Sequence, residues 1–343
     1  MKTFYKACFK ALFLITLFSI ISCKKDDPEA HKEPDVYVAG VEATNKGGFA
    51  KYWKNGVGTF LSDTSSQDYG SEANSIFVSG KDIYVAGRKF TKEGNMAVYW
   101  KNGQEVILSE KNAIASSIYV SGKDVYVAGN ESTFPVYWKN GQRMTLYKDK
   151  EIQGIASSIY VSGNDVYVSG VEYTSLGAVP KYWKNGQAVT LQRGQESRSG
   201  GRTIFVVGND AYVAGSTIEY QGETKALRYW KNGVATELND IGSMDETNCI
   251  FVSNNDVYVG GFYYDFNKWR GFGCYWKNGN RIDVSENKTS NTVTSIFVYK
   301  GEVYTCGIII DGIERAAYWN NKKEIILSSV PKNSSARSIF VTN

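Results

Sequence analysis

The chain has 343 residues, of which 14% are aromatic and only 5 are proline, and its formal net charge is +4. This composition excludes a disordered chain, because aromatic residues suit packed, pleated sheets and the 34 glycines suit turns. Length alone suggests about two domains, but internal repeats overrule that expectation.

Residues 1–22 are predicted to be a lipoprotein signal peptide. Three lysines precede an apolar run from Ala11 to Ile21, which is too short to span a bilayer as a mature helix. The segment ends in Ile20-Ile21-Ser22-Cys23, which resembles a bacterial lipobox. The resemblance implies cleavage before Cys23 and several acyl chains on it, which together anchor a protein stably to a membrane. The alternative is an ordinary signal with a chance cysteine.

Residues 23–34 are predicted to be the lipidated cysteine and a charged tether. The Lys24-Lys25-Asp26-Asp27 start resembles the pattern that follows the cysteine in surface-displayed lipoproteins of Bacteroidetes-type bacteria. We therefore expect an outer-membrane lipoprotein that is displayed on the cell surface. Loss of the three signal lysines lowers the net charge from +4 to +1, which leaves no field to recruit nucleic acid.

Three short tags recur in a fixed order through residues 35–343. They are typified by Ser75-Ile76-Phe77-Val78, by Asp82-Ile83-Tyr84-Val85-Ala86-Gly87 and by Tyr99-Trp100-Lys101-Asn102-Gly103. Successive Tyr-Trp pairs lie 47, 38, 45, 47, 46 and 43 residues apart. A period near 40–45 residues that holds four short strands, here called A to D from the axis outward, is the signature of a propeller blade.

The turns and the chain ends predict how the blades form and close. Asn-Gly, the strongest short hairpin signal, follows six of the seven Tyr-Trp tags. The domain begins on a strand B at Asp35 and ends on a lone strand A from Ser338 to Val341. We therefore expect an all-β, seven-bladed propeller of four-stranded antiparallel blades, closed by a C-terminal innermost strand that completes the first blade.

The paired Tyr and Trp of strand C are predicted to pack against opposite neighbouring blades, because adjacent residues in a strand point to opposite faces. They are therefore expected to be core rather than ligand-binding residues. Cys249, Cys274 and Cys306 fall at core positions of the repeat, and we expect no disulfide among them. We also expect a monomer.

The Tyr-Val-Ala-Gly and Tyr-Trp tags, over residues 35–343, resemble kelch-type and YVTN-type propeller repeats. The double glycine that kelch repeats carry after strand B is matched only at Gly260-Gly261. The chain as a whole is most similar to a lipoprotein family of Bacteroidetes. A likeness at the level of the fold implies no function.

The inventory of catalytic residues is small. The only histidine is His31, in the tether, which excludes histidine-dependent nucleophiles and histidine metal sites inside the propeller. No phosphate-binding glycine motif is present, and we expect no metal and no cofactor. Acids such as Asp63, Asp149 and Asp240 could form acid–base pairs, but we interpret them as solvated loop residues.

Loop variation predicts where ligands bind. The A–B and C–D turns are nearly identical in every blade, whereas the B–C and D–A connections vary and share one rim, as binding surfaces do. The segment from Phe262 to Phe272 stands out there for its aromatic residues beside an arginine. The candidate binding residues on it are Tyr263, Tyr264, Phe266, Trp269 and Arg270. The alternative is that these rings cover the edge of the blade.

Polar residues precede every strand A tag and are predicted to surround the mouth of the central channel, where they hold either a small polar ligand or water. The candidates for binding are Asn74, Arg202, Asn248 and Arg337. We expect a noncatalytic binding or scaffold lipoprotein with a glycan or protein partner on this rim. The alternatives are a carbohydrate hydrolase or lyase that uses rim carboxylates and tyrosines, and a structural protein that packs against envelope neighbours.

Overall fold

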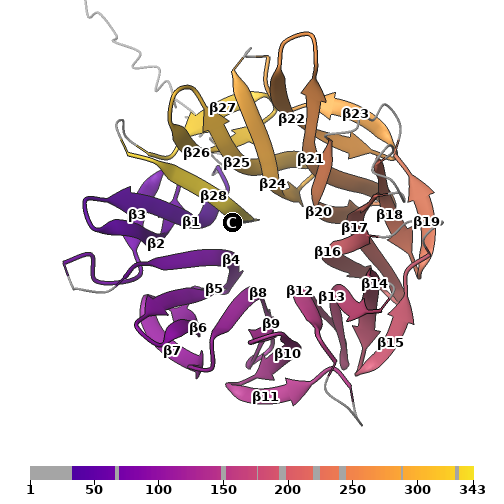
Figure 1. Cartoon of the computed structure of the whole chain (residues 1–343). Coiled ribbons are helices and arrows are strands. Elements are labelled where there is room, and N and C mark those ends of the chain that lie inside the picture. Colours follow the sequence, from indigo (N-terminus) through magenta and orange to yellow (C-terminus); the bar gives the residue numbers. More distant parts are fainter. Residues whose placement is uncertain are drawn as a thin grey trace, which may run out of the picture. The chain divides into compact units, whose positions relative to one another are not determined.

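The computed structural model describes residues 33–65, 69–147, 152–175, 177–192, 198–218, 225–238, 245–286, 289–328 and 332–343. Pro34–Asn343 is one compact unit, in which seven four-stranded antiparallel blades form a ring (Figure 1). This confirms the predicted seven-bladed, all-β propeller. The predicted signal peptide, Cys23 and most of the predicted tether lie outside the described residues. Within the described ranges, no helix is long and apolar enough to cross a membrane.

Each blade presents its strands in the order A to D from the axis outward. The A strands are β4 (Ser71–Ser79), β8 (Ala113–Ser121), β12 (Gly154–Ser162), β16 (Arg198–Val207), β20 (Glu246–Ser253), β24 (Ser290–Tyr299) and β28 (Ser334–Thr342). The B strands are β1 (Asp35–Thr44), β5 (Asp82–Thr91), β9 (Asp124–Glu131), β13 (Asp165–Thr174), β17 (Asp210–Ile218), β21 (Asp256–Asp265) and β25 (Glu302–Ile310).

The two outer sets of strands are shorter. The C strands are β2 (Gly47–Lys54), β6 (Gly94–Lys101), β10 (Phe134–Lys139), β14 (Gly177–Lys184), β18 (Lys225–Lys231), β22 (Arg270–Lys277) and β26 (Glu314–Asn320). The D strands are β3 (Val57–Phe60), β7 (Gln104–Ser109), β11 (Gln142–Thr145), β15 (Gln187–Thr190), β19 (Val234–Glu237), β23 (Asn280–Asp283) and β27 (Lys323–Ile326). Blade 1 contains β28, β1, β2 and β3, and blades 2 to 7 follow in chain order.

The C-terminal strand closes the ring, as predicted. Strand β28 pairs antiparallel with β1, and Ile339 lies opposite Val38. Blade 1 therefore takes its innermost strand from one end of the chain and its other three strands from the opposite end. The pairing removes the open edges that two unpaired strands would leave.

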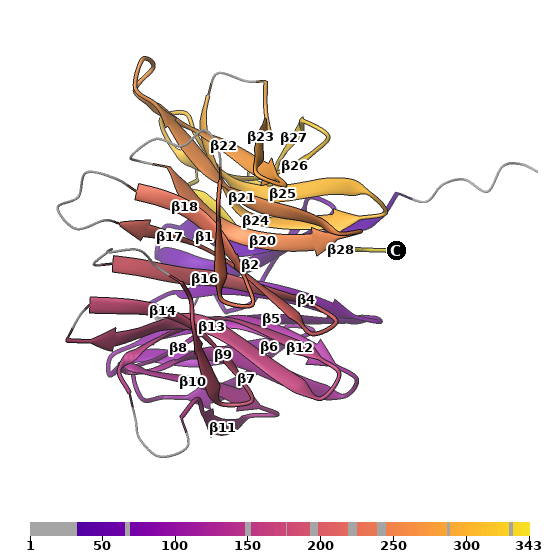
Figure 2. The same ribbon diagram turned by 90° about the vertical axis from the view of Figure 1, so that its right-hand side faces the viewer.

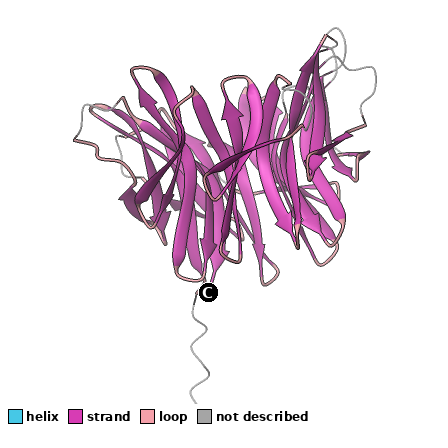
Figure 3. Ribbon diagram, turned by 90° about the horizontal axis from the view of Figure 1, so that it is seen from below, coloured by secondary structure: helices cyan, strands magenta, loops and turns pink. Residues whose placement is uncertain are grey.

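The two faces of the ring differ in their connections (Figures 2 and 3). On one face, here called the short-turn face, two-residue turns join C to D in every blade and A to B in blades 2 to 7, as at 102–103 and 80–81. Asn102 and Gly103 both have positive φ, at 51° and 81°, which a type I′ turn requires. The opposite, variable face carries connections that range from residues 45–46 to residues 61–70.

The paired Tyr and Trp of strand C face opposite blades, as predicted. Trp100 of blade 2 packs with Ala39 of blade 1, whereas Tyr99 packs against the cluster around Trp138 of blade 3. All seven of these tryptophans are almost fully buried, at no more than 1% exposure. Most of the tyrosines are only half-buried. The tryptophans therefore supply more of the hydrophobic contact between blades than their tyrosine neighbours do.

Every strand A contains a β-bulge at the position just before its tag. In blade 2 the register shifts between Ala73 and Ser75, which leaves Asn74 as the extra residue. The same shift occurs in the other six blades. The bulge brings the carbonyl oxygen of Glu72 so close to Gly87 that a Cβ there would lie 1.8 Å from it. This close approach explains why the strand B tag ends in glycine in all seven blades.

Candidate functional site

The repeated polar residues of the short-turn face form ion pairs and hydrogen bonds with one another within their own blade. In blade 2, Lys101 Nζ lies 3.0 Å from Asp82 Oδ2, and Asn102 Nδ2 donates to Asp82 Oδ1 at 2.8 Å. The backbone N–H of Ile83 donates to Asn102 Oδ1 at 2.8 Å. The Asn102 hydrogen bond and the Lys101 ammonium together lower the pKa of the Asp82 carboxyl. Blades 1, 3, 4, 5 and 6 repeat the Lys–Asp–Asn arrangement, so these residues serve the turns.

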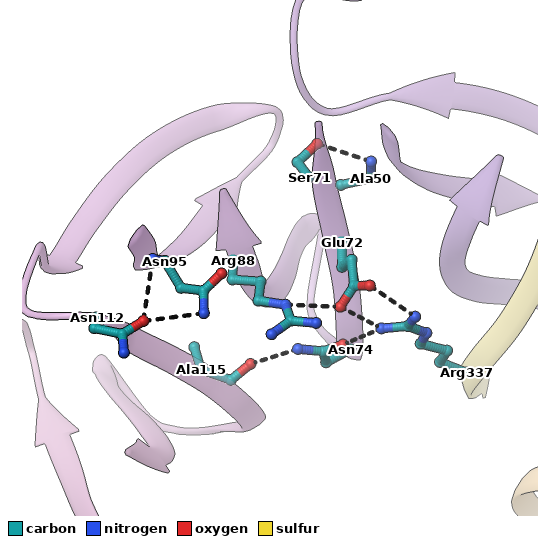
Figure 4. Close-up of polar contacts among 9 residues, drawn as sticks. All are labelled: Ala50, Ser71, Glu72, Asn74, Arg88, Asn95, Asn112, Ala115 and Arg337. Carbon is teal, nitrogen blue, oxygen red and sulfur yellow. Dashed lines mark hydrogen bonds and ion pairs between the residues drawn. The ribbon is translucent and has the colours of Figure 1, made fainter. Parts of the chain in front are cut away.

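The variable face holds the predicted channel-mouth residues, and the structure joins them in pairs. Figure 4 shows that Arg337, on the bulge of blade 1, donates from Nη1 to Asn74 Oδ1 at 2.7 Å and to Glu72 Oε2 at 2.9 Å. Arg88 Nε lies 2.9 Å from the same Glu72 oxygen. Asn74 Nδ2 in turn donates to the carbonyl oxygen of Ala115 in blade 3, at 2.9 Å. This network connects three blades around the mouth.

A second copy of this arrangement joins blades 5 and 6. Arg202 Nη1 donates to Asn248 Oδ1 at 3.2 Å, and its Nη2 lies 3.4 Å from Glu246 Oε2. Asn248 Nδ2 donates to the carbonyl oxygen of Val293 in blade 7, at 2.8 Å. The four residues predicted at the channel mouth therefore form two latches between neighbouring blades. In both, arginine reaches to an asparagine and to the glutamate two positions before it.

Glu72 is the centre of the first latch and is half-buried. Burial alone would raise the pKa of its carboxyl, but the Arg337 and Arg88 guanidinium groups more than offset that effect, so the pKa is lowered. Glu72 is therefore held as a carboxylate at neutral pH, already paired with two cations. Additional ligands would have to compete with those partners.

The axis of the ring is lined by aromatic side chains, which the sequence prediction missed. The third residue of each strand A tag is Phe or Tyr, and the seven rings form a closed circle of neighbours: Phe77, Tyr119, Tyr160, Phe205, Phe251, Phe297 and Phe340. Their centroids lie 4.5–5.0 Å apart and their planes are inclined by 45–54°. These are tilted contacts of the kind that aromatic pairs favour. The repeated aromatic residue at one tag position was the signal in the sequence.

The hairpin formed by β21 and β22 in blade 6 carries the other predicted binding residues. Tyr263 packs inward, and its ring centroid lies 5.6 Å from that of Phe272. The guanidinium carbon of Arg281 lies 3.9 Å from the centroid of the Tyr263 ring. Tyr264 meets Phe266 edge-on at 5.0 Å, and its backbone N–H donates to Asp245 Oδ1 at 2.8 Å. Both tyrosines are partly buried. The rings of both tyrosines therefore contact other side chains of blade 6.

Trp269 and Phe266 are displayed at the tip of the same hairpin. Trp269 is 76% exposed and Phe266 is 45% exposed. Trp269 also has a φ of 52°, in the left-handed region that a side chain with a Cβ adopts only at a cost in energy. Arg270 follows it as an exposed residue that begins β22. A large apolar ring that is both exposed and strained contributes little to the fold and points to a role outside it.

The predicted acid and thiol side chains that the structure describes are engaged in local contacts or buried. Asp63 Oδ1 accepts hydrogen bonds from the backbone N–H and the hydroxyl of Ser65, which fixes its own loop. Asp149 and Asp240 lie outside the described residues. Cys249, Cys274 and Cys306 are buried and form no disulfide within the described part of the chain. Burial raises the pKa of the Cys306 thiol to about 12.

No protein-family model and no curated protein matches the sequence. Among solved structures, the chain is similar to the β-propeller domain of the trilobed protease from Pyrococcus furiosus, with a TM-score of 0.54 and 10% identity over 87% of this chain and 95% of that one. That domain has an open velcro topology, whereas in this chain β28 pairs with β1 and closes the ring. The periplasmic gluconolactonase of Pseudomonas aeruginosa has a TM-score of 0.43 and 10% identity over 91% of this chain and 99% of that one. At 10% identity, the similarity to the trilobed-protease domain shows the β-propeller fold alone.

Proposed function

We propose that the chain is a noncatalytic binding or scaffold lipoprotein of the bacterial envelope, and that its variable face holds a glycan or protein partner. The observation that carries this proposal is Trp269. Its indole ring is exposed and belongs to no core cluster among the described residues, and its backbone has a positive φ. Exposed tryptophan beside arginine is the composition of binding hot spots.

The position of the first strand of the propeller, β1, also supports a partner on the variable face. Strand β1 begins at Asp35, which pairs with Thr342 at the short-turn end of blade 1. A lipid on Cys23 would be joined to that end through residues 24–34, which reach at most about 40 Å when fully extended. The variable face lies at the opposite ends of the strands and would therefore be directed away from the membrane. A partner outside the cell surface would meet it first.

The observed contacts leave little for the hydrolase alternative. Acid–base catalysis by two carboxylates needs groups that can exchange protons with a substrate. The described acids nearest the channel mouth, Glu72 and Glu246, are ion-paired with arginines. Asp63 fixes its own loop. No contact of the described residues favours this alternative over binding.

Site-specific photo-cross-linking in intact cells tests the proposal. A photoreactive amino acid replaces Asn267, at the hairpin tip, or Lys81, in a turn of the short-turn face; both positions are exposed. We expect a covalent adduct with a discrete protein or glycan from position 267, and none from position 81. Adducts that form equally from both positions, or from neither, would contradict a partner on the variable face.

A further inference from the structure

A cavity of about 300 Å³ lies between blades 6 and 7, beside the turn formed by Asn321 and Lys322. Its walls are Tyr275, Ile282, Asp283 and Val284 from blade 6 and Val303, Thr305 and Trp319 from blade 7. This volume is at the lower end of the range for small-molecule sites. The cavity is separate from the exposed hairpin tip, since neither Phe266 nor Trp269 lines it.

The cavity coincides with departures from the repeat. At the position of Val284 the other six interfaces carry a larger leucine, and at the position of Thr305 they carry valine. The leucines are Leu61, Leu108, Leu146, Leu191, Leu238 and Leu327, and the valines are Val38, Val85, Val127, Val168, Val213 and Val259. The first change removes a methylene from the wall, and the second places a hydroxyl on it. Val284 therefore leaves more space, and Thr305 adds a polar group, at the interface of blades 6 and 7 alone.

The turn beside the cavity has also lost its usual role. In the other six blades the turn asparagine accepts a hydrogen bond from the backbone of strand B. In blade 7, Glu302 replaces the usual aspartate and receives the Asn320 side chain instead, at 3.3 Å. The Asn321 side chain makes no hydrogen bond among the described residues. Lys322 has a φ of 65° where every other blade has glycine, a strained backbone of the kind that marks functional sites.

The polar groups around the cavity indicate an uncharged ligand. Thr305 is 2% exposed, and its hydroxyl has no hydrogen-bond partner among the described residues. The Tyr275 phenol is half-buried and also lacks such a partner. Two charged side chains line the rim, and both are already paired: Asp283 Oδ1 lies 3.6 Å from Arg281 Nε, and Lys322 Nζ lies 3.1 Å from Glu286 Oε1. A charged ligand would have to compete with one of these two pairs.

We propose that this cavity binds a neutral hexose ring, either free or as one unit of a glycan. The aromatic and aliphatic walls fit the apolar face of a pyranose, and the Thr305, Tyr275 and Asn321 side chains can each donate and accept hydrogen bonds to its hydroxyl groups. A purely apolar molecule would leave the buried Thr305 hydroxyl unpaired. This inference does not rest on a partner at Trp269.

Saturation-transfer NMR and calorimetric titration on the full-length protein, with glucose, galactose, mannose and N-acetylglucosamine as probes, test this. The decisive variant is Val284→Leu with Thr305→Val, which gives this interface the residues of the other six and should therefore fold. The matched control is Leu238→Val with Val259→Thr, which makes the opposite changes between blades 5 and 6. We expect at least one hexose to bind, with affinity reduced at least tenfold in the filled variant and kept within twofold in the control.

Three results would overturn the proposal. The first is that none of the four hexoses binds. The second is that a hexose binds the filled variant as well as it binds the natural chain. The third is that phenol, tested in parallel, binds in the cavity while the sugars do not, because that would identify an aromatic rather than a polyhydroxylated ligand.

Discussion

Arg337 and Asn74 are separated by 263 positions in the chain, yet Arg337 Nη1 donates to Asn74 Oδ1 at 2.7 Å. The contact joins the last strand to the second blade and so lies across the closure of the ring. We predict that Arg337→Ala lowers the free energy of unfolding by about 1–2 kcal/mol, because it leaves half-buried Glu72 with one cation fewer. Urea denaturation measures this. Arg202→Ala, at the more exposed second latch, should have a smaller effect, and a larger one would contradict this ranking.

The Arg337 contribution should depend on pH. The folded-state pKa of Glu72 is lowered from its ordinary value of 4.5, so the stabilisation is fully present above that value and is lost as pH falls through the lowered folded pKa. The difference in unfolding free energy between the natural chain and Arg337→Ala should therefore shrink in acid. The turn aspartates also titrate, but they are common to both proteins and cancel. A difference that stays constant from pH 7 to pH 3 or grows in acid would show that Glu72 is not the partner that matters.

The bulge predicts a strict need for glycine at the end of the strand B tag. Gly87→Ala would place a methyl group 1.8 Å from a backbone oxygen of the neighbouring strand. We predict a loss of about 3 kcal/mol, at the upper end for overpacking, because the backbone there cannot shift without breaking the pairing. The control is Gly200→Ala, where an added methyl group meets nothing within 4 Å. Equal melting temperatures for the two variants would contradict the role of the bulge.

The circle of aromatic rings should be part of the core of the propeller rather than a ligand site. Phe251 contacts both Phe205 and Phe297, at 4.5 and 4.9 Å. Its replacement by alanine should cost about 2–3 kcal/mol, less than a fully buried phenylalanine because the ring is half-buried. Tyr119→Phe keeps the ring and should change stability little. Thermal unfolding of the two variants checks this, and a neutral Phe251→Ala would mean that the rings do not support one another.

Much of the fold could be predicted because the same strand and turn signals recur in all seven blades. The Asn-Gly turns, the Tyr-Trp pair and the lone tag at Ser338 indicate hairpins, packing between blades and closure. The bulge was not visible, because one extra residue changes the register without changing the composition of the strand. The pairing of Arg337 with Glu72 was hidden as well, since it joins opposite ends of the chain.

The same contrast applies to the sites. Phe262 to Phe272 is conspicuous as an aromatic segment, but its sequence does not indicate that Tyr263 turns inward while Trp269 turns out. That difference comes from the pleat and from the left-handed residue at the turn. The cavity between blades 6 and 7 depends on Val284 and Thr305, which are ordinary strand residues. They become informative only once the other six interfaces are superimposed on theirs.

The most direct test of the central claim is to measure stability and partner capture together for Trp269→Gly. Glycine relieves the positive φ, so the variant should gain roughly 0.5–1 kcal/mol in unfolding free energy. It should also lose the cross-linked adduct formed from position 267. Ser132→Gly is the matched control, with a φ of 51° in the corresponding connection of blade 3; it should gain stability and keep the adduct. A Trp269→Gly protein that is less stable, or that still forms the adduct, would contradict the assignment of Trp269 to binding.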